Sequence, residues 1–518
     1  MNKTAAPPPD SHRTSTGIEG LDEILGGGVT PNRLYLVEGT PGTGKTTFSL
    51  QFLLEGARRG EPGLYVTLSE TEAELRAVAQ THGWSLDALE LFELVPEAGL
   101  DPDQEQTLLH PSEVELGETV RGVMERVDAL KPKRVVLDSL SELRLLAQNP
   151  LRYRRQILAL KHFFSSRDCT VLVLDDRTSE PGDLQLHSIA HGVISLDQTA
   201  TGFGSERRQL RVIKMRGIKY SGGYHDMSIV TGGVRVYPRL VAAEHRGTIS
   251  TRMLTTGVDG LDALLGGGLV PGTTTLLSGP AGVGKTTAAV RCMVSALDRG
   301  ERAAFFLFDE RLPTLMMRSA TLGMDLRPHM DEGRLSIRQI DPAELSPGEF
   351  ATAVREAVEE DGARVVVVDS LNAYLQAMPE DRHLTLQMHE LLSYLGQQGV
   401  VTLMILGQHG LVGEIRSDVD LSYLADTVLL LRFFEADGEV RKAISVVKTR
   451  TTDHERTIRE FRVDRHGLSI GAPLRAFHGI LTGVPTYRGA AAPLMDGAGS
   501  ASAGAHALGE GSDGASDE

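Results

Sequence analysis

The pattern of apolar and polar positions describes one unit that is used twice. In each half of the chain, short continuous apolar runs are separated by stretches with helical spacing. A continuous apolar run suits a parallel strand that is covered on both faces, and strands that alternate with helices predict a doubly wound, mainly parallel α/β sheet. The predicted strands are Leu34–Val37, Gly63–Leu68, Arg134–Ser139 and Cys169–Leu174 in the first half, and Ala303–Phe308, Val365–Ser370 and Val400–Leu406 in the second.

A glycine-rich segment before each P-loop, here called the leader, supports the repeat within the sequence. Thr16–Gly28 matches Thr256–Gly268 almost residue by residue, and the two copies are 240 positions apart. A repeat with so long a period indicates duplicated domains rather than a solenoid. We predict a first domain at 13–243, a linker at 244–252 and a second domain at 253–488, with a disordered N-terminus at 1–12 and a disordered Gly/Ala/Ser-rich acidic tail at 489–518.

Both leaders run into a phosphate-binding loop of the form G-x-x-x-x-G-K-T. Each loop follows an apolar run and precedes helical spacing, which is the context that this motif requires. Glycine lets backbone N–H groups close around phosphate, the lysine reaches the β- and γ-phosphates of ATP, and the threonine hydroxyl ligates Mg²⁺. The predicted nucleotide-binding residues are Gly39, Thr40, Pro41, Gly42, Thr43, Gly44, Lys45, Thr46 and Thr47, and Gly279, Pro280, Ala281, Gly282, Val283, Gly284, Lys285, Thr286 and Thr287.

Carboxylates follow two further strands of each unit. Asp138 and Asp369 each end an apolar run, which is the Walker B pattern, and we expect them to bind Mg²⁺ together with Thr46 and Thr286. The preceding strand of each unit ends in Ser69-Glu70 or in Asp309-Glu310. Because the carboxyl ends of parallel strands meet at one edge of a sheet, all these side chains should converge on the phosphate-binding loop.

Composition narrows the class of protein. The chain has 518 residues, which is too long for one core, and a net charge of −16. That charge disfavours a general affinity for nucleic acid, which depends on lysine and arginine. Two cysteines, Cys169 and Cys292, give no disulfide framework, and no apolar stretch is long enough to span a bilayer, so we expect a cytoplasmic protein with no membrane association.

The leaders, the two P-loops and the two [VL]-D-S-L strands together resemble the KaiC family over roughly Thr14 to Ile470. The resemblance implies two tandem RecA-like P-loop NTPase domains, ATP and Mg²⁺ as ligands, and a homo-hexamer that binds ATP between subunits. It also implies an ATP hydrolase and serine/threonine autokinase that acts as a nucleotide- and phosphorylation-dependent signalling or timing switch. Basic residues at the ends of two strand-like runs would then act on the ATP of a neighbouring subunit, rather than lie on a solvated edge; these are Lys214, Arg216, Lys448 and Arg450.

The resemblance assigns the general base to the first position of each acidic pair. In the second repeat a carboxylate is retained as Asp309, beside Glu310. In the first repeat the base position is Ser69, which cannot accept a proton usefully at neutral pH. Two alternatives follow: Glu70 takes over as the base, or the first repeat binds ATP and hydrolyses it poorly.

The phosphoacceptor positions of the family fall on Ser422, with Tyr423 in place of a threonine, and on Ser417. Ser422 is either an acceptor or simply a polar residue at a helix surface. The segment Gly471–Pro485 does not resemble the peptide that recruits KaiA, so control by KaiA is not expected, whereas a KaiB-like or other signalling partner is compatible with the resemblance.

Two other functions compete with this one. A RecA-like DNA-dependent ATPase would need basic and aromatic loops, and the candidate loops Arg177–His187 and Gln408–Leu421 are poor in both. An ATP-assembled scaffold with little catalysis is the second alternative, which Ser69 favours for the first repeat. A zinc site at His187 and His191 is disfavoured because no third ligand accompanies them.

Overall fold

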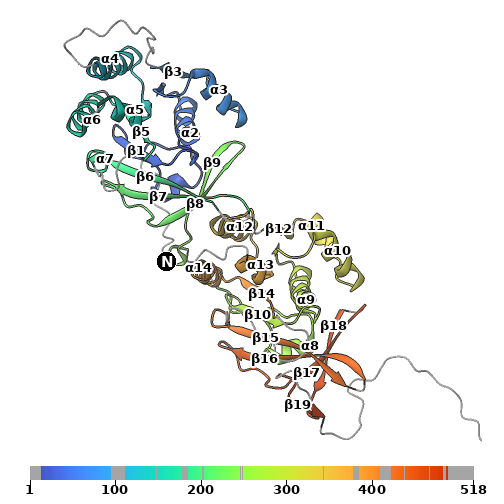
Figure 1. Cartoon of the computed structure of the whole chain (residues 1–518). Helices are drawn as coiled ribbons and strands as arrows, with labels where there is room; N and C mark the ends of the chain where they lie inside the picture. Colours follow the sequence, from blue (N-terminus) through green and yellow to red (C-terminus); the bar gives the residue numbers. More distant parts are fainter. Residues whose placement is uncertain are drawn as a thin grey trace, which may run out of the picture. The chain divides into compact units, whose positions relative to one another are not determined.

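The computed structural model (Figure 1) describes residues 13–94, 111–147, 149–177, 185–200, 204–245, 247, 249–341, 343–376, 384–408, 422–436, 438–465, 467–481 and 486–487. The predicted disordered ends, 1–12 and 489–518, lie outside these residues, as does Ser417. No helix among the described residues is long and apolar enough to cross a membrane.

The first sheet has nine strands in the order β3-β2-β4-β5-β1-β6-β7-β8-β9. The strands from β3 to β6 pair in parallel, and β7, β8 and β9 extend the sheet as antiparallel neighbours. The strand bounds are β1 Leu34–Gly39, β2 Gly63–Thr67, β3 Leu89–Glu93, β4 Arg134–Asp138, β5 Thr170–Asp175, β6 Gly192–Thr199, β7 Arg207–Met215, β8 Tyr224–Val230 and β9 Gly233–Tyr237.

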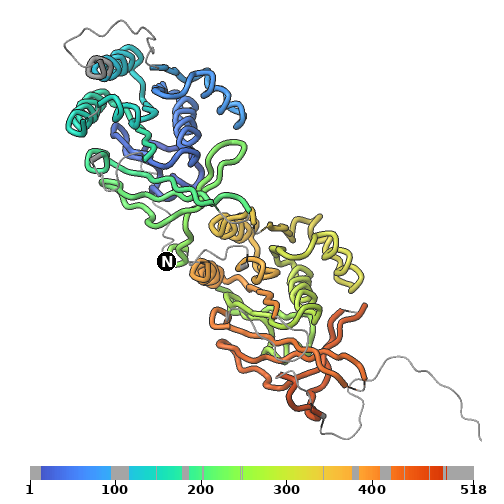
Figure 2. The backbone as a smooth tube through the Cα atoms, in the orientation of Figure 1, coloured from blue at the N-terminus to red at the C-terminus, as the bar shows by residue number. Residues whose placement is uncertain are grey.

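The second sheet repeats this topology in the order β12-β11-β13-β14-β10-β15-β16-β17-β18. Its strands are β10 Thr274–Gly279, β11 Ala303–Leu307, β12 Leu335–Gln339, β13 Val365–Asp369, β14 Val401–Gly407, β15 Thr427–Ala436, β16 Glu439–Thr449, β17 Arg459–Asp464 and β18 Gly467–Pro473. A separate two-stranded sheet joins β19 Phe477–His478 to β20 Thr486–Tyr487. The predicted α/β class with two tandem, mainly parallel sheets is confirmed. Among the described residues, each nine-stranded sheet is built from strands of one repeat, and the colours of Figure 2 let the two repeats be followed along the chain.

Helices cover both faces of the first sheet. On one face, side chains of α2 and α3 pack with inward residues of β1 and β2, among them Phe48, Leu75 and Tyr65. On the other face, α4, α5 and α6 pack with alternate residues of the same strands. Their bounds, with those of the short helices, are α1 Leu21–Ile24, α2 Lys45–Arg58, α3 Glu72–Thr81, α4 Pro111–Leu130, α5 Leu140–Ala147, α6 Pro150–Ser165, α7 Gln185–Ile189 and η1 Ala242–Glu244.

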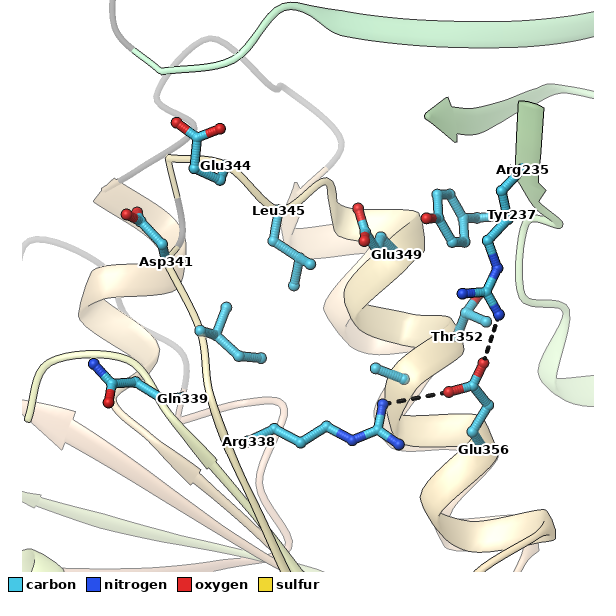
Figure 3. Close-up of a pocket in the computed structure, with 12 residues that line it drawn as sticks. Arg235, Tyr237, Arg338, Gln339, Asp341, Glu344, Leu345, Glu349, Thr352 and Glu356 are labelled. Atoms are coloured by element: carbon cyan, nitrogen blue, oxygen red, sulfur yellow. Dashed lines mark hydrogen bonds and ion pairs between the residues drawn. The ribbon is translucent and has the colours of Figure 1, made fainter. Parts of the chain in front are cut away.

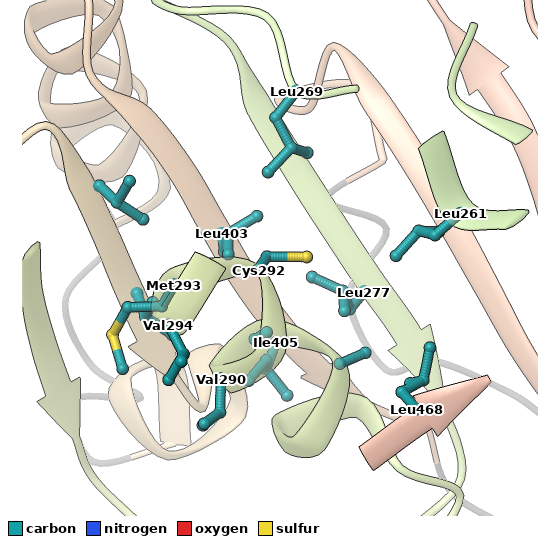
Figure 4. Packing of buried hydrophobic residues seen from close by; sticks show 14 of the residues in the cluster. Leu261, Leu269, Leu277, Val290, Cys292, Met293, Val294, Leu403, Ile405 and Leu468 are labelled. Carbon is teal, nitrogen blue, oxygen red and sulfur yellow. The ribbon is translucent and has the colours of Figure 1, made fainter. Parts of the chain in front are cut away.

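The core of the second sheet centres on α9, the helix that follows its P-loop. Figure 4 shows Val290, Met293 and Val294 of this helix beside Leu403 and Ile405 of β14, and all are buried. The remaining helices of the second repeat are α8 Asp259–Leu264, α9 Lys285–Asp298, α10 Leu312–Thr321, α11 Arg327–Asp331, α12 Pro347–Glu359, α13 Leu371–Gln376 and α14 Leu384–Gln397.

The leader motif is explained by its local hydrogen bonds. The Asp22 carboxylate accepts hydrogen bonds from the backbone N–H and the hydroxyl of Thr16, and Asp262 accepts one from the N–H of Thr256. Gly20 has φ +81°, and a Cβ atom there would lie 1.9 Å from the carbonyl oxygen of Val236. The threonine and aspartate therefore fix the turn, and glycine is required for a close backbone approach.

The chain divides into two compact units. The first contains residues 1–248, 338–363 and 373–398, and the second contains residues 249–337, 364–372 and 399–518. The two sheets fall inside the predicted ranges 13–243 and 253–488. The exact limits of the domains and of the linker 244–252 stay predictions.

Candidate nucleotide sites

The first P-loop joins the buried strand β1 to helix α2. Gly44 precedes the helix with φ +96°, a left-handed conformation that favours glycine. The Lys45 ammonium donates hydrogen bonds to the carbonyl oxygens of Gly39 at 2.8 Å and Thr40 at 3.2 Å. The loop is therefore folded around its own lysine, at the carboxyl end of the central strand.

The second P-loop has the same geometry. Lys285 donates to the carbonyl oxygens of Gly279 and Pro280, both at 2.8 Å, and Gly284 has φ +115°. Burial lowers the pKa of Lys285. A phosphate group would restore the charge balance around this buried ammonium, which fits the predicted role.

The second repeat brings a hydroxyl and a carboxylate together beside its P-loop. Thr286 Oγ1 donates a 2.7 Å hydrogen bond to Asp369 Oδ2 at the tip of β13. Burial, with smaller contributions from the nearby Asp309 and Glu310, raises the pKa of Asp369 to about 6. Mg²⁺ prefers hard oxygen ligands of this kind, so the two side chains fit the predicted magnesium site.

The corresponding aspartate of the first repeat has a different partner. The hydroxyl of Tyr65 on β2 donates a 2.5 Å hydrogen bond to Asp138 Oδ2, and burial raises the pKa of Asp138. Strand pairing places Tyr65 and Phe305 at equivalent positions, beside Val136 and Val367. Thr46 and Asp138 remain suitable oxygen donors for Mg²⁺, but the tyrosine hydroxyl already binds one carboxylate oxygen.

The acidic pair of the second repeat is held in place by two contacts. Ser370, which follows the Walker B aspartate, donates its hydroxyl to Asp309 Oδ2. Glu310 forms a two-point ion pair with Arg318 of α10, with N–O distances of 2.9 and 2.8 Å. Glu310 is therefore the member of the pair that is neutralised by a cation, whereas Asp309 is held by a hydroxyl, which suits the role of proton acceptor.

Glu70 in the first repeat is held differently. Its backbone N–H donates to the Thr67 hydroxyl at 3.0 Å, and its Oε2 atom is buried without a hydrogen-bond partner among the described residues. Burial first, and then the neighbouring Asp138, raises the pKa of Glu70. Ser69 beside it is exposed.

The structure adds a carboxylate that the sequence analysis missed. Asp176 follows β5, and its Oδ1 atom lies 2.8 Å from the ammonium of Lys45. Its Oδ2 atom accepts a 3.2 Å hydrogen bond from the Ser139 hydroxyl. The available signal was Asp175-Asp176 immediately after the predicted strand Cys169–Leu174, although only the strand order places that tip beside β1.

The basic residues of both repeats bind backbone carbonyls within their own chain. Lys214 donates to His187 and Ala190, and Arg216 donates to Ser188. Their action on a neighbouring subunit stays a prediction.

The second repeat has the same arrangement. Lys448 donates to the carbonyl oxygens of Ser422 and Ala425 at 2.8 and 2.9 Å, and Arg450 donates to that of Tyr423 at 3.0 Å. Ser422 is half-buried, whereas Tyr423 is 54% exposed. The pair that resembles the family's phosphoacceptors is therefore held by the two predicted trans-acting cations.

His187 binds a carboxylate rather than a metal ligand set. Its Nε2 atom lies 2.7 Å from Glu38 Oε2, and Arg177 approaches the other oxygen of Glu38 at 3.3 Å. Within the described part of the chain, no group of three or more His, Cys, Asp or Glu side chains is placed to hold a metal ion.

A pocket in the first compact unit lies apart from the predicted nucleotide residues. It is lined by Arg235 and Tyr237 of β9 and by residues of 338–356, including Arg338, Glu349 and Glu356 (Figure 3). Glu356 pairs with Arg235 at 3.2 Å and with Arg338 at 3.3 Å. Because its cations are already paired, this pocket is not a candidate for a nucleotide phosphate.

The fold and the paired sites define a tandem RecA-like P-loop ATPase of the α/β class. The family model "ATPase: KaiC" matches residues 14–241 and 254–475. The chain therefore belongs to the KaiC family and is an ATP-binding, KaiC-like protein.

Individual relatives cover nearly the whole chain. A circadian clock protein KaiC3 from Synechocystis sp. is 28% identical over 92% of this chain and 95% of its own. The circadian clock oscillator protein KaiC from Parathermosynechococcus lividus is 27% identical over 93% of this chain and 91% of its own, and that from Synechococcus elongatus is 27% identical over 91% of each.

Proposed function

We propose that this protein hydrolyses ATP at both P-loops and transfers the γ-phosphoryl group of ATP to its own Ser422, as a nucleotide- and phosphorylation-dependent signalling or timing switch. The observation that carries the proposal is the second site, where Lys285, Asp309 and Asp369 lie at the carboxyl edge of one sheet. The relatives described above are circadian clock proteins, which supports the timing role.

In the second repeat, Lys285 would bind the β- and γ-phosphates of ATP. Thr286 and Asp369 would hold Mg²⁺, which offsets the phosphate charge. Asp309, held by Ser370, would accept the proton of the attacking hydroxyl. Arg318 would hold Glu310 in place through its ion pair and neutralise that carboxylate beside Asp309.

The acceptor decides between the two reactions. Water would give hydrolysis, whereas the Ser422 hydroxyl would give a phosphoserine. In a homo-hexamer with ATP between subunits, Lys448 and Arg450 would act on the nucleotide of the neighbouring subunit and keep Ser422 beside it, because they bind the backbone carbonyls of Ser422 and of the next residue, Tyr423. Lys214 and Arg216 would act on the neighbouring ATP in the first repeat. The resemblance to the family supports this assembly.

The autokinase step is tested by mass spectrometry of the intact protein and of its peptides after incubation with Mg·ATP. The matched variants are Ser422→Ala, which removes the acceptor, and Lys285→Ala, which removes the phosphate-binding lysine. We expect one phosphate on Ser422 in the parent and none at that residue in either variant. Accumulation of ADP without phosphate on Ser422 would leave the ATPase and eliminate the autokinase.

An ATP-assembled scaffold is the second candidate, for the first repeat only. The ion pair between Lys45 and Asp176 and the hydrogen bond between Tyr65 and Asp138 occupy two groups that ATP and Mg²⁺ would use. A scaffold predicts that ATP binds at the first site and is not turned over. A DNA-dependent ATPase is opposed by the net charge of −16.

A further inference from the structure

The two repeats differ in which strand supplies a carboxylate to the serine that follows the Walker B aspartate. In the second repeat, Ser370 donates to Asp309 at the end of β11. In the first repeat, the equivalent Ser139 donates to Asp176 at the end of β5. The equivalence of the two serines follows from strand pairing, since Thr67 pairs with Asp138 and Leu307 pairs with Asp369.

Each repeat lacks the carboxylate that the other repeat uses for this serine. The first repeat has Ser69 where the second has Asp309. Conversely, Gly407 of β14 is the counterpart of Asp176. Glu38 and Ser278 are equivalent positions, 240 residues apart, and they pair with Asp175 and Leu406. The next residue is Asp176 in the first repeat and Gly407, which pairs with Gly279, in the second. Each repeat therefore has one carboxylate for this serine, and it comes from a different neighbouring strand.

The position of Asp176 suits a reacting group. Its Oδ1 atom lies 2.8 Å from the Lys45 ammonium, and a P-loop lysine contacts the β- and γ-phosphates of a bound nucleotide. A carboxylate at that distance lies within a few ångströms of the γ-phosphate, where the attacking water must lie. The side chain is 29% exposed, so water can reach it. Its backbone is fixed, because the N–H of Asp176 donates to the Ser141 hydroxyl at 3.1 Å.

We propose that Asp176 is the general base of ATP hydrolysis in the first repeat, in place of the carboxylate that Ser69 lacks. The inference rests on the proposed ATPase function. The Asp176 carboxylate accepts a proton from water as the water oxygen forms a bond to the γ-phosphorus. The bond between the γ-phosphorus and the β,γ-bridging oxygen breaks, ADP and inorganic phosphate leave, and Asp176 then loses the proton to solvent.

Glu70 is the competing base. Strand pairing makes it the counterpart of Glu310, the residue that Arg318 clamps, rather than of Asp309. Its Oε2 atom is buried, whereas Asp176 already contacts both the P-loop lysine and Ser139, the counterpart of the serine that holds Asp309 in the second repeat. The contacts favour Asp176.

The test uses the full chain with Asp309→Asn and Glu310→Gln, which silence catalysis at the second site and leave its P-loop intact. In this background we compare Asp176→Asn, Glu70→Gln and the matched control Asp168→Asn. Asp168 is an exposed aspartate just before the other end of β5. The readouts are the rate of ADP formation and equilibrium binding of a fluorescent ATP analogue.

We expect Asp176→Asn to lower the rate of ADP formation by about 100-fold or more, the usual contribution of a general base. Nucleotide binding should be retained, because the amide frees Lys45 from its ion pair. The control Asp168→Asn should hydrolyse ATP at the rate of the background protein. The variant Asp176→Gly should be rescued to within about tenfold by Ser69→Asp, which rebuilds the arrangement of the second repeat.

A parental rate in Asp176→Asn would overturn the inference, as would loss of hydrolysis in Glu70→Gln alone. If the background protein makes no ADP while the unmodified protein does, the first site has no base and this inference fails, whereas the proposed ATPase function stands. If the unmodified protein neither binds ATP nor forms ADP, the proposed function fails with it. If Asp176→Asn does not fold, the rate of ADP formation is measured instead for Asp176→Glu and for Asp176→Gly with and without Ser69→Asp.

Discussion

The Tyr65 hydroxyl donates a 2.5 Å hydrogen bond to the Oδ2 atom of Asp138, the Walker B aspartate of the first repeat. Burial, and then the Asp138 charge, raises the pKa of Tyr65 well above its usual range, so the hydroxyl stays a donor at neutral pH. The second repeat has Phe305 at this position, and its Asp369 is bound by Thr286 instead. The Walker B aspartates of the two candidate magnesium sites therefore have different hydrogen-bond donors.

Replacing Tyr65 by phenylalanine should strengthen Mg²⁺ binding at the first site. The change removes a competing hydrogen bond of about 1 kcal/mol, which corresponds to roughly a fivefold lower Mg²⁺ concentration for half-maximal nucleotide binding. The measurement is a Mg²⁺ titration of ATP binding in a Lys285→Ala background.

The reciprocal variant Phe305→Tyr, in a Lys45→Ala background, provides the matched control. It places a hydroxyl beside Asp369 and should raise the Mg²⁺ requirement of the second site by a similar factor. Unchanged titrations in both variants would show that the tyrosine does not compete with the metal.

Arg318→Ala should impair the second site without preventing ATP binding. The arginine binds both carboxylate oxygens of Glu310. Its removal leaves an unpaired, part-buried carboxylate beside Asp369, and a misplaced group near the chemistry can cost up to about 100-fold. We expect kcat for ADP formation in a Lys45→Ala background to fall at least tenfold, with KM for ATP changed less. Arg318→Lys keeps the charge but not the two-point contact, so it should recover only part of the rate.

Neither cysteine should react in the native protein. Cys169 is 1% exposed and Cys292 is 4% exposed, and burial raises their pKa values to about 11 and about 12. Because the thiolate is the reactive form, a thiol reagent at pH 8 should label both residues only after addition of denaturant. Rapid labelling of either cysteine without denaturant would contradict the described packing.

The same shifts predict a decline of stability at alkaline pH. A thiol whose pKa is raised by folding stays protonated in the folded state while the unfolded chain ionises. Its contribution to the free energy of unfolding is present below pH 9 and is lost as pH rises toward about 12. Cys292→Ala should therefore flatten the pH dependence of the urea midpoint between pH 9 and about 11, relative to the parent.

Met293→Ala should destabilise the second repeat. The side chain is completely buried in the core between α9 and the second sheet (Figure 4). Truncation of a buried methionine costs about 2–5 kcal/mol through lost burial and the cavity that remains. Urea unfolding should show a lower midpoint, and an unchanged midpoint would indicate that the core collapses around the smaller side chain.

Much of the fold and the P-loop of each candidate site could be predicted from the sequence, because those features are local. The strand before each P-loop, the glycines around Lys45 and Lys285, and the aspartates that end β4 and β13 all lie within short contiguous motifs. The duplication added a second copy that confirmed each motif. Strands without a comparable motif were not predicted; they are β3, β6, β8 and β9 of the first sheet and β12, β15, β17 and β18 of the second.

The remainder of the site depends on strand order and on side-chain partners. Asp176 reaches Lys45 because β5 lies beside β1, and apolar periodicity does not give that order. Tyr65 and Phe305 look like equivalent core aromatics until the hydroxyl is seen beside Asp138. Arg318 lies eight positions after Glu310, and only the path of the chain into α10 brings the two together.

The rate of ADP formation by the purified full-length chain tests the central claim most directly. It should be measured with Mg·ATP for the parent, Lys45→Ala, Lys285→Ala and the double variant. If both P-loops are ATPase sites, each single variant should retain part of the parental rate and the double variant should form no ADP above background. A double variant that hydrolyses ATP at the parental rate, or a parent that forms no ADP, would contradict the account.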